Sequence, residues 1–358
     1  MADESSLEDR LKPARKSLQS TDESESSGTA NTTKSRIPGK TIFLSVPRVL
    51  FGWLTSMFRG RRPIVAFLGV TILIMVFYLP VGMWIRHTID DDLGFRPGPD
   101  QVTGGGSAAV DMTTALLLRE VQEHGWVANA LPFMPGYYLD NMPNYQKGMM
   151  AALSRFVVEM TDQIGRSRGS SQADPDLTQA QGAIKYDGEK WSMVASASAD
   201  TNYVYAAAAL ARYNTRLAEK QAIFDARADN LLTTLERISA DLGSASAVID
   251  QAVQDNTFFL WDRTSDDHFF DIKGRMYGYA MIMRGLEVDF EAVVRNRNLG
   301  AVWTQTISSL EAAAALDPYT IINGSPDGLV LPNHLTTMGF YLLRARTQLK
   351  EVNAILLR

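Results

Sequence analysis

The most prominent feature of the hydrophobic pattern is an apolar run at residues 64–85. The run reads IVAFLGVTILIMVFYLPVGMWI and contains no ionisable side chain except Tyr78. A helix of this length extends over about 33 Å, which is enough to cross the hydrocarbon core of a bilayer. Tyr78 and Trp84 fall near one end, where aromatic side chains favour the membrane interface. The pattern therefore predicts a single transmembrane helix.

Beyond residue 107 the chain has helical periodicity, with almost no period-two alternation that would indicate strands. The clearest pattern lies at residues 217–252, where apolar side chains recur every seven residues with a second set between them. Such spacing lets a long helix bury one stripe, which predicts a long helical hairpin rather than a homomeric coiled coil. Gly243 is expected to divide the pattern into two helices. The stripe consists of Leu217, Phe224, Ala228, Leu231, Leu235, Ile238, Leu242, Ala245, Ile249 and Ala252, with Gln221 as its one polar member.

Further helices are predicted from amphipathic stretches of good helix formers. Between the first two, a loop at residues 131–144 carries three prolines and two adjacent tyrosines, whose rings form either core or a contact surface. Residues 165–177 are predicted as a polar loop and residues 186–188 as a turn. The predicted fold class is all-α, a helical bundle. The expected helices cover residues 110–124, 145–164, 199–224, 276–294, 301–316 and 335–357.

Composition divides the chain into five parts. Residues 1–40 contain few apolar side chains, which predicts a disordered cytoplasmic tail. Residues 41–63 are apolar but interrupted by proline, arginine and glycine, which predicts a basic segment on the membrane surface. A re-entrant position, or packing against a partner's membrane helix, stays open for that segment. The transmembrane helix at 64–85 is followed by a flexible tether at 88–107 and a helical domain at 108–358.

Charge is distributed unevenly around the predicted membrane helix. Arg59, Arg61 and Arg62 precede it, whereas three consecutive aspartates follow it at residues 90–92. Because lysine and arginine are retained on the cytoplasmic side, the N-terminus should face the cytoplasm and the domain the opposite compartment. The apolar run begins too far along the chain, and is too long, for a cleaved signal peptide. The helix is therefore expected to remain as an anchor.

Charge balance and the lack of cysteine exclude several functions. After residue 87 the chain holds 23 basic and 33 acidic side chains, and this net negative charge argues against nucleic acid as the main partner. The lack of cysteine excludes thiolate catalysis, disulfides and cysteine-type metal sites. No phosphate-binding loop, dinucleotide fingerprint or H-E-x-x-H sequence occurs, so no cofactor is predicted.

An acidic cluster at residues 261–275 is the first candidate for chemistry. Asp267, His268 and Asp271 lie within five positions, a composition that suggests metal binding or acid–base chemistry. Their spacing matches no established metal motif, and acidic residues at the start of a helix commonly cap backbone amides. They are therefore named as metal candidates, while no metal site is predicted. The cluster also contains Asp262 and Asp266.

A second group of carboxylates, Glu287, Asp289 and Glu291, could serve a sugar-cleaving site. A helix spreads these three side chains over about 200° of arc, so they cannot all converge on one substrate. A solvated face, or ion pairs with Arg295 and Arg297, is the preferred interpretation. No catalytic residue is predicted from this group.

Residues 165–169, GRSRG, match the nucleophile-elbow pattern G-x-S-x-G by letter alone. That motif requires a strand before the serine and a helix after it, whereas here a predicted helix precedes and a polar loop follows. A chance match explains it. The four histidines, His87, His124, His268 and His334, lack the spacing of metal ligands and are interpreted as structural polar groups.

Residues 137–150, YYLDNMPNYQKGMM, and residues 271–290, DIKGRMYGYAMIMRGLEVDF, taken with the single apolar run, carry a family resemblance. The sequence resembles an uncharacterised family of proteobacterial inner-membrane proteins that covers residues from about 64 to the C-terminus. The resemblance implies a periplasmic domain and transfers no catalytic residue.

Two functions are predicted from these features together. The preferred one is a membrane-anchored periplasmic scaffold or binding module of the cell envelope, with the lipid bilayer and an envelope protein as partners. A membrane-tethered hydrolase acting on the cell wall is the alternative, and a homo-oligomer is left open.

Overall fold

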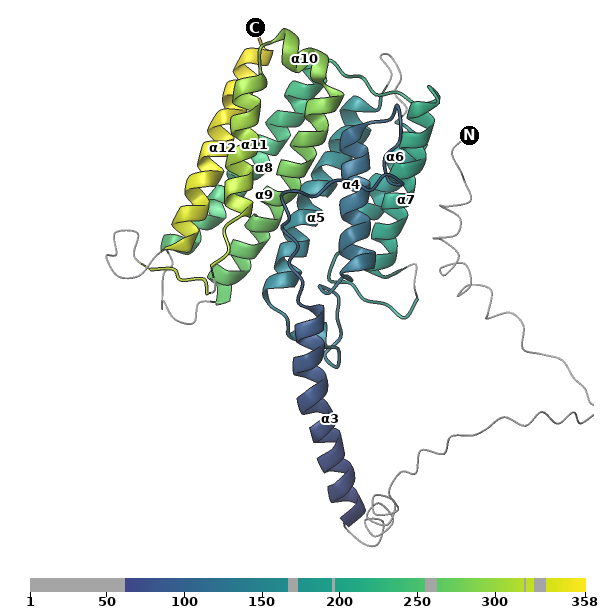
Figure 1. Ribbon diagram of the computed structural model, residues 1–358, viewed down its shortest axis with the longest axis vertical. Helices are drawn as coiled ribbons and strands as arrows, with labels where there is room; N and C mark the ends of the chain where they lie inside the picture. Colours follow the sequence, from purple (N-terminus) through teal and green to yellow (C-terminus); the bar gives the residue numbers. More distant parts are fainter. Residues whose placement is uncertain (1–61, 167–172, 195–196, 255–262, 319, 325–332) are drawn as a thin grey trace, which may run out of the picture. The chain divides into compact units, whose positions relative to one another are not determined.

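The computed structural model describes residues 62–166, 173–194, 197–254, 263–318, 320–324 and 333–358 (Figure 1). The chain divides into two compact units, Met1–Ala66 and Phe67–Arg358, and the contacts given below lie within the second. The predicted tail, residues 1–40, and all but the end of the predicted surface segment, residues 41–63, lie outside the described residues.

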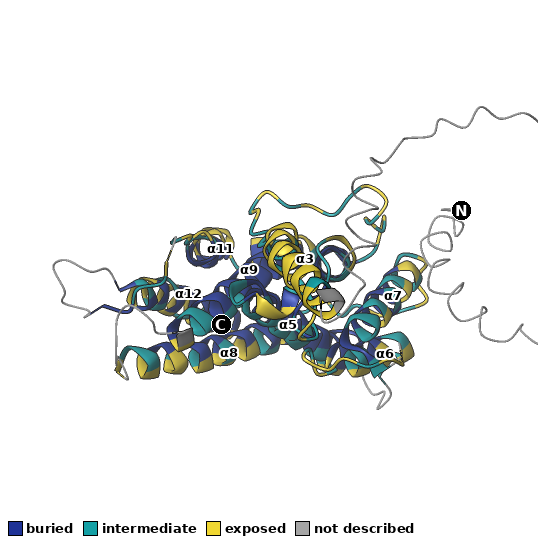
Figure 2. Cartoon of the chain, turned by 90° about the horizontal axis from the view of Figure 1, so that it is seen from below, coloured by how far each residue is buried: buried dark blue, intermediate teal, exposed yellow. Residues whose placement is uncertain are grey.

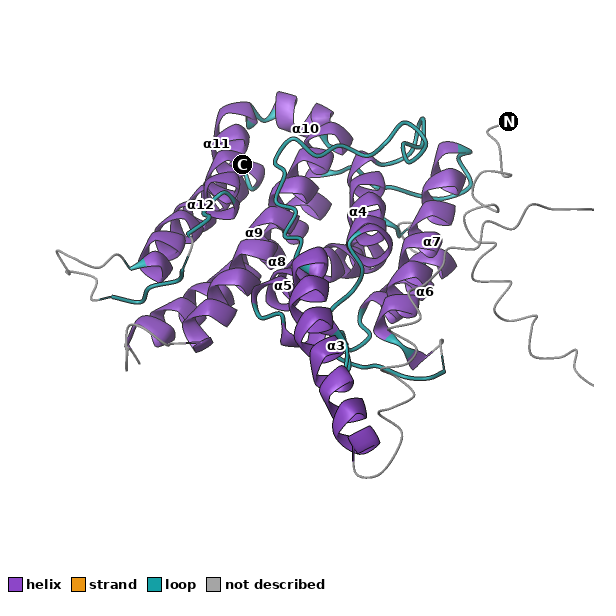
Figure 3. Ribbon diagram, turned by 60° about the horizontal axis from the view of Figure 1, so that its bottom comes forward, coloured by secondary structure: helices purple, strands orange, loops and turns teal. Residues whose placement is uncertain are grey.

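Helices form the regular structure of the described residues, which contain no strand (Figure 3). The predicted all-α fold is confirmed. An antiparallel bridge pairs Asn323 with Asn333. The α-helices are α3 (Arg62–Arg86), α4 (Ala108–Leu118), α5 (Asn141–Glu159), α6 (Pro175–Ile184), α7 (Ala199–Ala218), α8 (Ala228–Gln254), α9 (Arg263–Asp289), α10 (Glu291–Asn296), α11 (Gly300–Ala314) and α12 (His334–Leu356). Single π turns follow α4 (Arg119–Glu123) and α5 (Met160–Ile164), and Pro135–Tyr138 is a 3₁₀ turn.

The apolar run forms α3, which is long and apolar enough to cross a membrane over Ile64–Arg86. Its mean hydropathy is 2.6, and none of its most apolar part is buried against the rest of the protein. Figure 2 shows its surface as almost entirely exposed. Pro80 lies inside the helix, six residues before its C-terminal end.

α9 lies at the centre of the domain and packs against α4, α5, α8, α11 and α12. It meets α5 at glycine positions on both helices. A Cβ at Gly274 of α9 would overlap the carbonyl group of Tyr145, and one at Gly148 of α5 would overlap that of Asp271. The two backbones can approach this closely only because these positions lack a side chain. Large buried rings, including those of Phe269, Tyr277 and Trp303, fill the surrounding core.

The predicted seam at residues 217–252 is divided differently in the structure. α7 ends at Ala218, and α8 does not begin until Ala228, because Lys220 adopts a left-handed backbone conformation with φ of 61° that ends the helix. α8 then continues through Gly243, where the absent side chain leaves room for the guanidinium group of Arg346 on α12. The expected break at Gly243 was therefore wrong.

α8 buries the predicted stripe against α12 and to a lesser extent α9, so its main neighbour comes from the far end of the chain. The buried members include Leu231, Leu235, Ile238 and Leu242. The partner of α8 is thus not the preceding helix α7, which packs against α6 and α4 instead. Heptad spacing identified the buried face correctly, but spacing alone carries no information about the partner.

The starts of α9 and α6 differ from the sequence expectation. α9 starts at Arg263, thirteen residues before the predicted start, so the acidic cluster lies in its first turns. α6 begins within the region predicted as a polar loop, because Asp174 accepts hydrogen bonds from the backbone N–H groups of Asp176 and Leu177, and Pro175 occupies the first helical turn. Local capping chemistry, rather than hydrophobic periodicity, starts this short helix.

Candidate functional site

Residues 88–107 connect α3 to α4 and are tied to the domain at both ends. The backbone of this segment is coil, as its glycine and proline content predicts. However, the segment predicted as a flexible tether carries aspartates that pair with buried cations at its start, and its final residues hydrogen-bond to α7 and α9. Because its polar groups are held in this way, the segment forms part of the domain wall.

At the start of this segment, Asp90 meets a buried cluster on the π turn after α4. The Arg119 Nη1 atom lies 3.3 Å from the Asp90 carboxylate, and Nη2 donates to the Asp90 carbonyl oxygen at 2.9 Å. Arg119 also donates to the Tyr277 hydroxyl at 3.0 Å and to Glu120 at 3.2 Å. Burial raises the pKa of Glu120, and the charge of Arg119 only partly offsets that effect. π turns recur at functional sites, so this cluster is part of the candidate site.

A second buried cation, Lys273 of α9, pairs with the next aspartate. Its Nζ atom lies 2.6 Å from the carboxylate of Asp91 and donates to the carbonyl oxygen of Leu316 at 2.8 Å. Moving an unpaired ammonium group from water into a protein interior costs roughly several kcal/mol, even after the surroundings relax. The pairing explains how a lysine with a side chain that is 1% exposed lies in the core. The sequence analysis missed both Arg119 and Lys273, because no residue pattern marks a cation as buried.

At its other end the segment leads into α4, whose first turn is capped by a carboxylate from a different helix. Asp289, the last residue of α9, accepts hydrogen bonds from the Ser107 hydroxyl (2.6 Å) and from the backbone N–H groups of Ala108 (2.7 Å) and Ala109 (3.0 Å). The Ser107 backbone N–H donates to Asn214 of α7 at 2.7 Å. Burial raises the pKa of Asp289, although these hydrogen bonds oppose the shift. The cap joins α4, α7 and α9 to the end of the segment.

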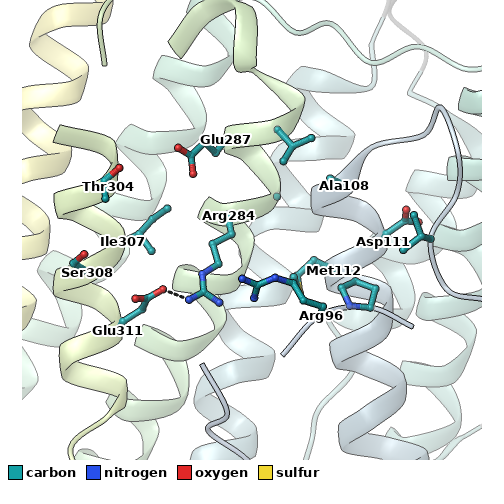
Figure 4. A pocket seen from close by; sticks show the side chains of 14 residues that line it. Arg96, Ala108, Asp111, Met112, Arg284, Glu287, Thr304, Ile307, Ser308 and Glu311 are labelled. Atoms are coloured by element: carbon teal, nitrogen blue, oxygen red, sulfur yellow. Dashed lines mark ion pairs between the residues drawn. The ribbon is translucent and has the colours of Figure 1, made fainter. Parts of the chain in front are cut away.

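Between these two attachments lies a cleft of about 530 Å³, bounded by the segment, α4, α9 and α11 (Figure 4). Its size falls within the usual range for small-molecule sites, which is roughly 300–1,000 Å³. The walls combine apolar side chains with charged ones, so the cleft suits a ligand that has both an apolar surface and a polar group. The apolar side chains include Val102, Met112, Val288 and Ile307; the charged ones are Arg96, Asp111, Arg284, Glu287 and Glu311.

Most charged side chains of the cleft already have partners. Arg284 forms an ion pair with Glu311 of α11 and donates to the carbonyl oxygen of Leu93, which holds the segment over the cleft. Asp111 accepts hydrogen bonds from Asn214 and from the backbone N–H of Thr103. Burial raises the pKa of Asp111 despite these bonds.

Glu287 differs from the other carboxylates of the cleft. Burial alone accounts for the raised pKa of its side chain. Its carboxyl group is therefore the member of the cleft best suited to receive a cationic or hydrogen-bonding group of a ligand.

The three carboxylates considered for sugar cleavage go to three different places. Glu287 lines the cleft, Asp289 caps α4, and exposed Glu291 pairs with Arg295 at 3.2 Å, one of the two expected ion pairs. They do not converge on one substrate, as the helical spacing predicts. A paired-carboxylate mechanism needs two such groups on either side of one bond.

The acidic cluster at the start of α9 is also divided among separate partners. Asp267 accepts a hydrogen bond from Asn144 at 2.5 Å, and burial together with the neighbouring charge of Asp140 raises its pKa. Asp271 forms an ion pair with Arg275 at 2.8 Å, while His268 is half-buried on the same turns. Within the described ranges, no three histidine or acidic side chains are arranged to hold a metal ion. Asp262 lies outside those ranges.

The remaining motifs have structural partners or fall outside the described residues. Residues 167–169 of the G-x-S-x-G match lie outside them, and the part before the match belongs to a π turn that follows α5. His124 Nε2 lies 3.2 Å from the carboxylate of Asp90, and His334 Nδ1 accepts a hydrogen bond from the backbone N–H of Ile322 at 3.0 Å. These histidines act as structural polar groups.

The chain matches the model of a known protein family. The model of a family described as an uncharacterized protein conserved in bacteria, DUF2333, matches residues 98–264 and 261–358. These ranges contain α4, α9 and α11, which line the cleft, and they begin after α3. No curated protein and no solved structure matches the chain. The resemblance to an uncharacterised bacterial family, inferred from residues 137–150 and 271–290, is confirmed.

Proposed function

Because the chain belongs to the DUF2333 family of uncharacterized bacterial proteins, we propose a function from its own geometry. The protein is a single-pass membrane protein of the cell envelope, and its helical domain is a scaffold or binding module. The domain faces the periplasm of a Gram-negative bacterium, and the N-terminus faces the cytoplasm. The cleft between residues 88–107 and helices α4, α9 and α11 is its binding site.

The single observation that carries the anchor is the unburied surface of α3. Large apolar side chains along the helix, such as those of Phe67, Ile74 and Phe77, are exposed by half or more of their area. Exposing this much apolar surface to water is unfavourable by about 25 cal/mol per Å², whereas lipid removes that penalty. The three arginines at 59, 61 and 62 favour a cytoplasmic N-terminus.

A binding role is supported by the state of the charged groups in the cleft. Asp111, Arg284 and Glu311 are held by partners within the domain, so they shape and polarise the cleft. A cell-wall hydrolase with a paired-carboxylate mechanism needs two free carboxylates at one site, and Asp289, one of the carboxylates considered for that role, is occupied by three hydrogen bonds. The geometry therefore favours recognition of a ligand or partner over bond cleavage.

The anchor and its orientation are tested by fusing alkaline phosphatase or green fluorescent protein behind Arg358. Alkaline phosphatase folds only outside the cytoplasm, so the first fusion should be active and the second should not fluoresce. The membrane fraction should retain the protein after washing at alkaline pH. A fluorescent fusion, or release of the protein by the wash, would contradict the proposal.

The binding role is tested by filling the cleft. Ser308 is exposed at its rim on α11, so Ser308→Trp should block the cleft without disturbing the core. Ser244→Trp, at an exposed position of α8, is the matched control. Chemical cross-linking in cells should give products with the wild type and the control that are absent with Ser308→Trp. Identical products from all three proteins would refute a role for the cleft.

A further inference from the structure

The C-terminal end of α3 contacts the domain before its apolar run has ended. Met83 packs against a small apolar cluster formed by Val127, Leu139 and Met142. One residue earlier, Gly82 faces Pro135 so closely that an added Cβ would overlap the proline ring. A second cleft of about 530 Å³ is lined by Tyr78, Gly82 and Ile85 of α3 together with the loop Met134–Gly136 and Trp191.

These contacts set the depth of the loop relative to the membrane. Tyr78 precedes the last apolar residue, Ile85, by seven positions, which is about 10 Å along a helix axis. If the apolar run of α3 occupies the hydrocarbon core, the loop beside Tyr78 and Gly82 must reach into the bilayer, at the level of roughly the last 10 Å of that run. An amphipathic surface element reaches a similar depth, about 5–10 Å, into the headgroup boundary.

Two segments far apart in sequence expose large apolar side chains at this end of the domain. Phe133, Tyr137 and Tyr138 belong to the loop after the π turn, and Phe133 is 60% exposed. Trp191, Met193 and Val194 belong to the connection between α6 and α7, and Met193 is 91% exposed. Other exposed apolar residues lie on α3 or elsewhere on the domain, such as Phe340 and Leu343 on α12, whereas these six lie in or directly next to the two segments that line the cleft with α3. Tyrosine and tryptophan are the residues that favour the membrane interface.

We propose that residues 131–140 and 190–194 form a lipid-binding surface that inserts into the outer leaflet of the bilayer crossed by α3. The inference rests on the proposed function, because it takes the membrane position of α3 as given. Three anchoring points, namely the helix and the two loops, then fix the orientation of the domain on the membrane. The aromatic loop predicted as either core or contact surface is, in this account, a contact surface for lipid.

The chain contains no cysteine, so each introduced cysteine is the unique labelling site. We would label Phe133→Cys and Met193→Cys with an environment-sensitive fluorophore in detergent. The full-length protein is then reconstituted into vesicles of phosphatidylethanolamine and phosphatidylglycerol. Leu73→Cys, in the middle of α3, reports the anchor. Phe340→Cys, which is 59% exposed on α12, is the matched control for an exposed aromatic position away from the loops.

The proposal expects the labels at 133 and 193 to be quenched several-fold more by lipids with a shallow nitroxide than the label at 340. The label at 340 should instead be quenched by aqueous iodide, and the label at 73 only by a deep nitroxide.

The outcomes separate the two proposals. If position 73 reports lipid but 133 and 193 report water, the lipid-binding surface is refuted and the anchor stands. If position 73 also reports water, the proposed function itself fails. If 133 and 193 are shielded from iodide but not reached by either nitroxide, a protein contact covers them, and the proposed lipid contact is wrong.

Discussion

α3 and α9 are long helices of similar length, but the more apolar helix is exposed and the more highly charged helix is buried. α3 has 25 residues and no acidic side chain, yet its most apolar part is not buried in the protein at all. α9 has 27 residues and several charged side chains, yet it occupies the centre of the domain with most of its length buried. In Figure 2 the first is coloured as exposed and the second mainly as buried.

Burial within this protein follows the availability of partners for polar groups. Lys273, Arg275 and Arg284 of α9 each form an ion pair with an acidic side chain from another part of the chain. Their desolvation is thereby compensated, and α9 can lie in the core. Between its terminal arginines α3 has no charged side chain to pair, and it is suited to a solvent that offers no polar partners.

The largest expected effect comes from the close approach of α9 to α5. Gly274→Ala would place a methyl group against the backbone of Tyr145, so the helices must separate. We expect a loss of roughly 3 kcal/mol or more in the free energy of unfolding, measured by denaturant titration in detergent. Gly182→Ala in α6, where nothing lies within 4 Å of the new methyl group, should instead stabilise by up to about 1 kcal/mol. Equal responses from the two variants would contradict the close approach.

The next effect tests the surroundings assigned to α3. Ile74→Arg introduces a charge near the middle of the apolar run, where insertion becomes less favourable by about 2.5–3.5 kcal/mol. The variant should be lost from the membrane fraction, or should accumulate at a much lower level, as quantified by immunoblotting. Phe340→Arg, on the exposed face of α12, is the control and should stay membrane-bound at the wild-type level. Normal membrane retention of both variants would mean that α3 does not cross the lipid.

A smaller effect is expected from the buried lysine of α9. Lys273→Met leaves the carboxylate of Asp91 and the carbonyl oxygen of Leu316 without their donor. We expect destabilisation of about 2 kcal/mol, which is less than for a fully buried pair because the Asp91 side chain retains 33% exposure. Arg295→Met removes an exposed pair with Glu291 and should cost less than about 0.5 kcal/mol. The comparison fails if thermal unfolding of the two variants shifts by the same amount.

The fold was partly predictable because its main signals are local. An uncharged run, a heptad stripe and runs of good helix formers depend on neighbours in sequence, and they identified α3, the buried face of α8 and the all-α class. The start of α9 was not predictable from the sequence. Its first turns contain Asp266, Asp267 and Asp271, and such a cluster of acidic residues gives no hydrophobic periodicity that would indicate a helix. Their partners, such as Asn144 and Arg275, determine the helix there, and Asn144 is distant in sequence.

The candidate site was less predictable than the fold for the same reason. Asp90 and Asp91 were interpreted only by their position after the apolar run, and the sequence contains no sign that Arg119 and Lys273 receive them. Helical spacing correctly indicated that the three carboxylates considered for chemistry, Glu287, Asp289 and Glu291, point in different directions. It could not indicate which of them lines a cleft, because the opposite wall comes from residues 96–102 and from α11.

The smallest expected effect concerns Glu287, a charge of α9 that burial alone perturbs. Its pKa is raised in the folded state, so the stability associated with its neutral form is fully present at low pH and is lost as the pH rises through that raised value. Glu287→Gln stays neutral at every pH. The variant should therefore match the wild type in stability below about pH 4. At pH 7–8 it should be more stable by about 0.3 kcal/mol, a small gain because the group is partly exposed, and should unfold at a slightly higher temperature. Thermal unfolding followed across this range measures the difference, and Glu291→Gln, whose ion pair with Arg295 is exposed, should show no such gain at neutral pH. A variant that is less stable than the wild type at pH 7–8 would mean that the Glu287 carboxylate is held by a favourable partner, and α9 would then have no unpaired charge facing the cleft.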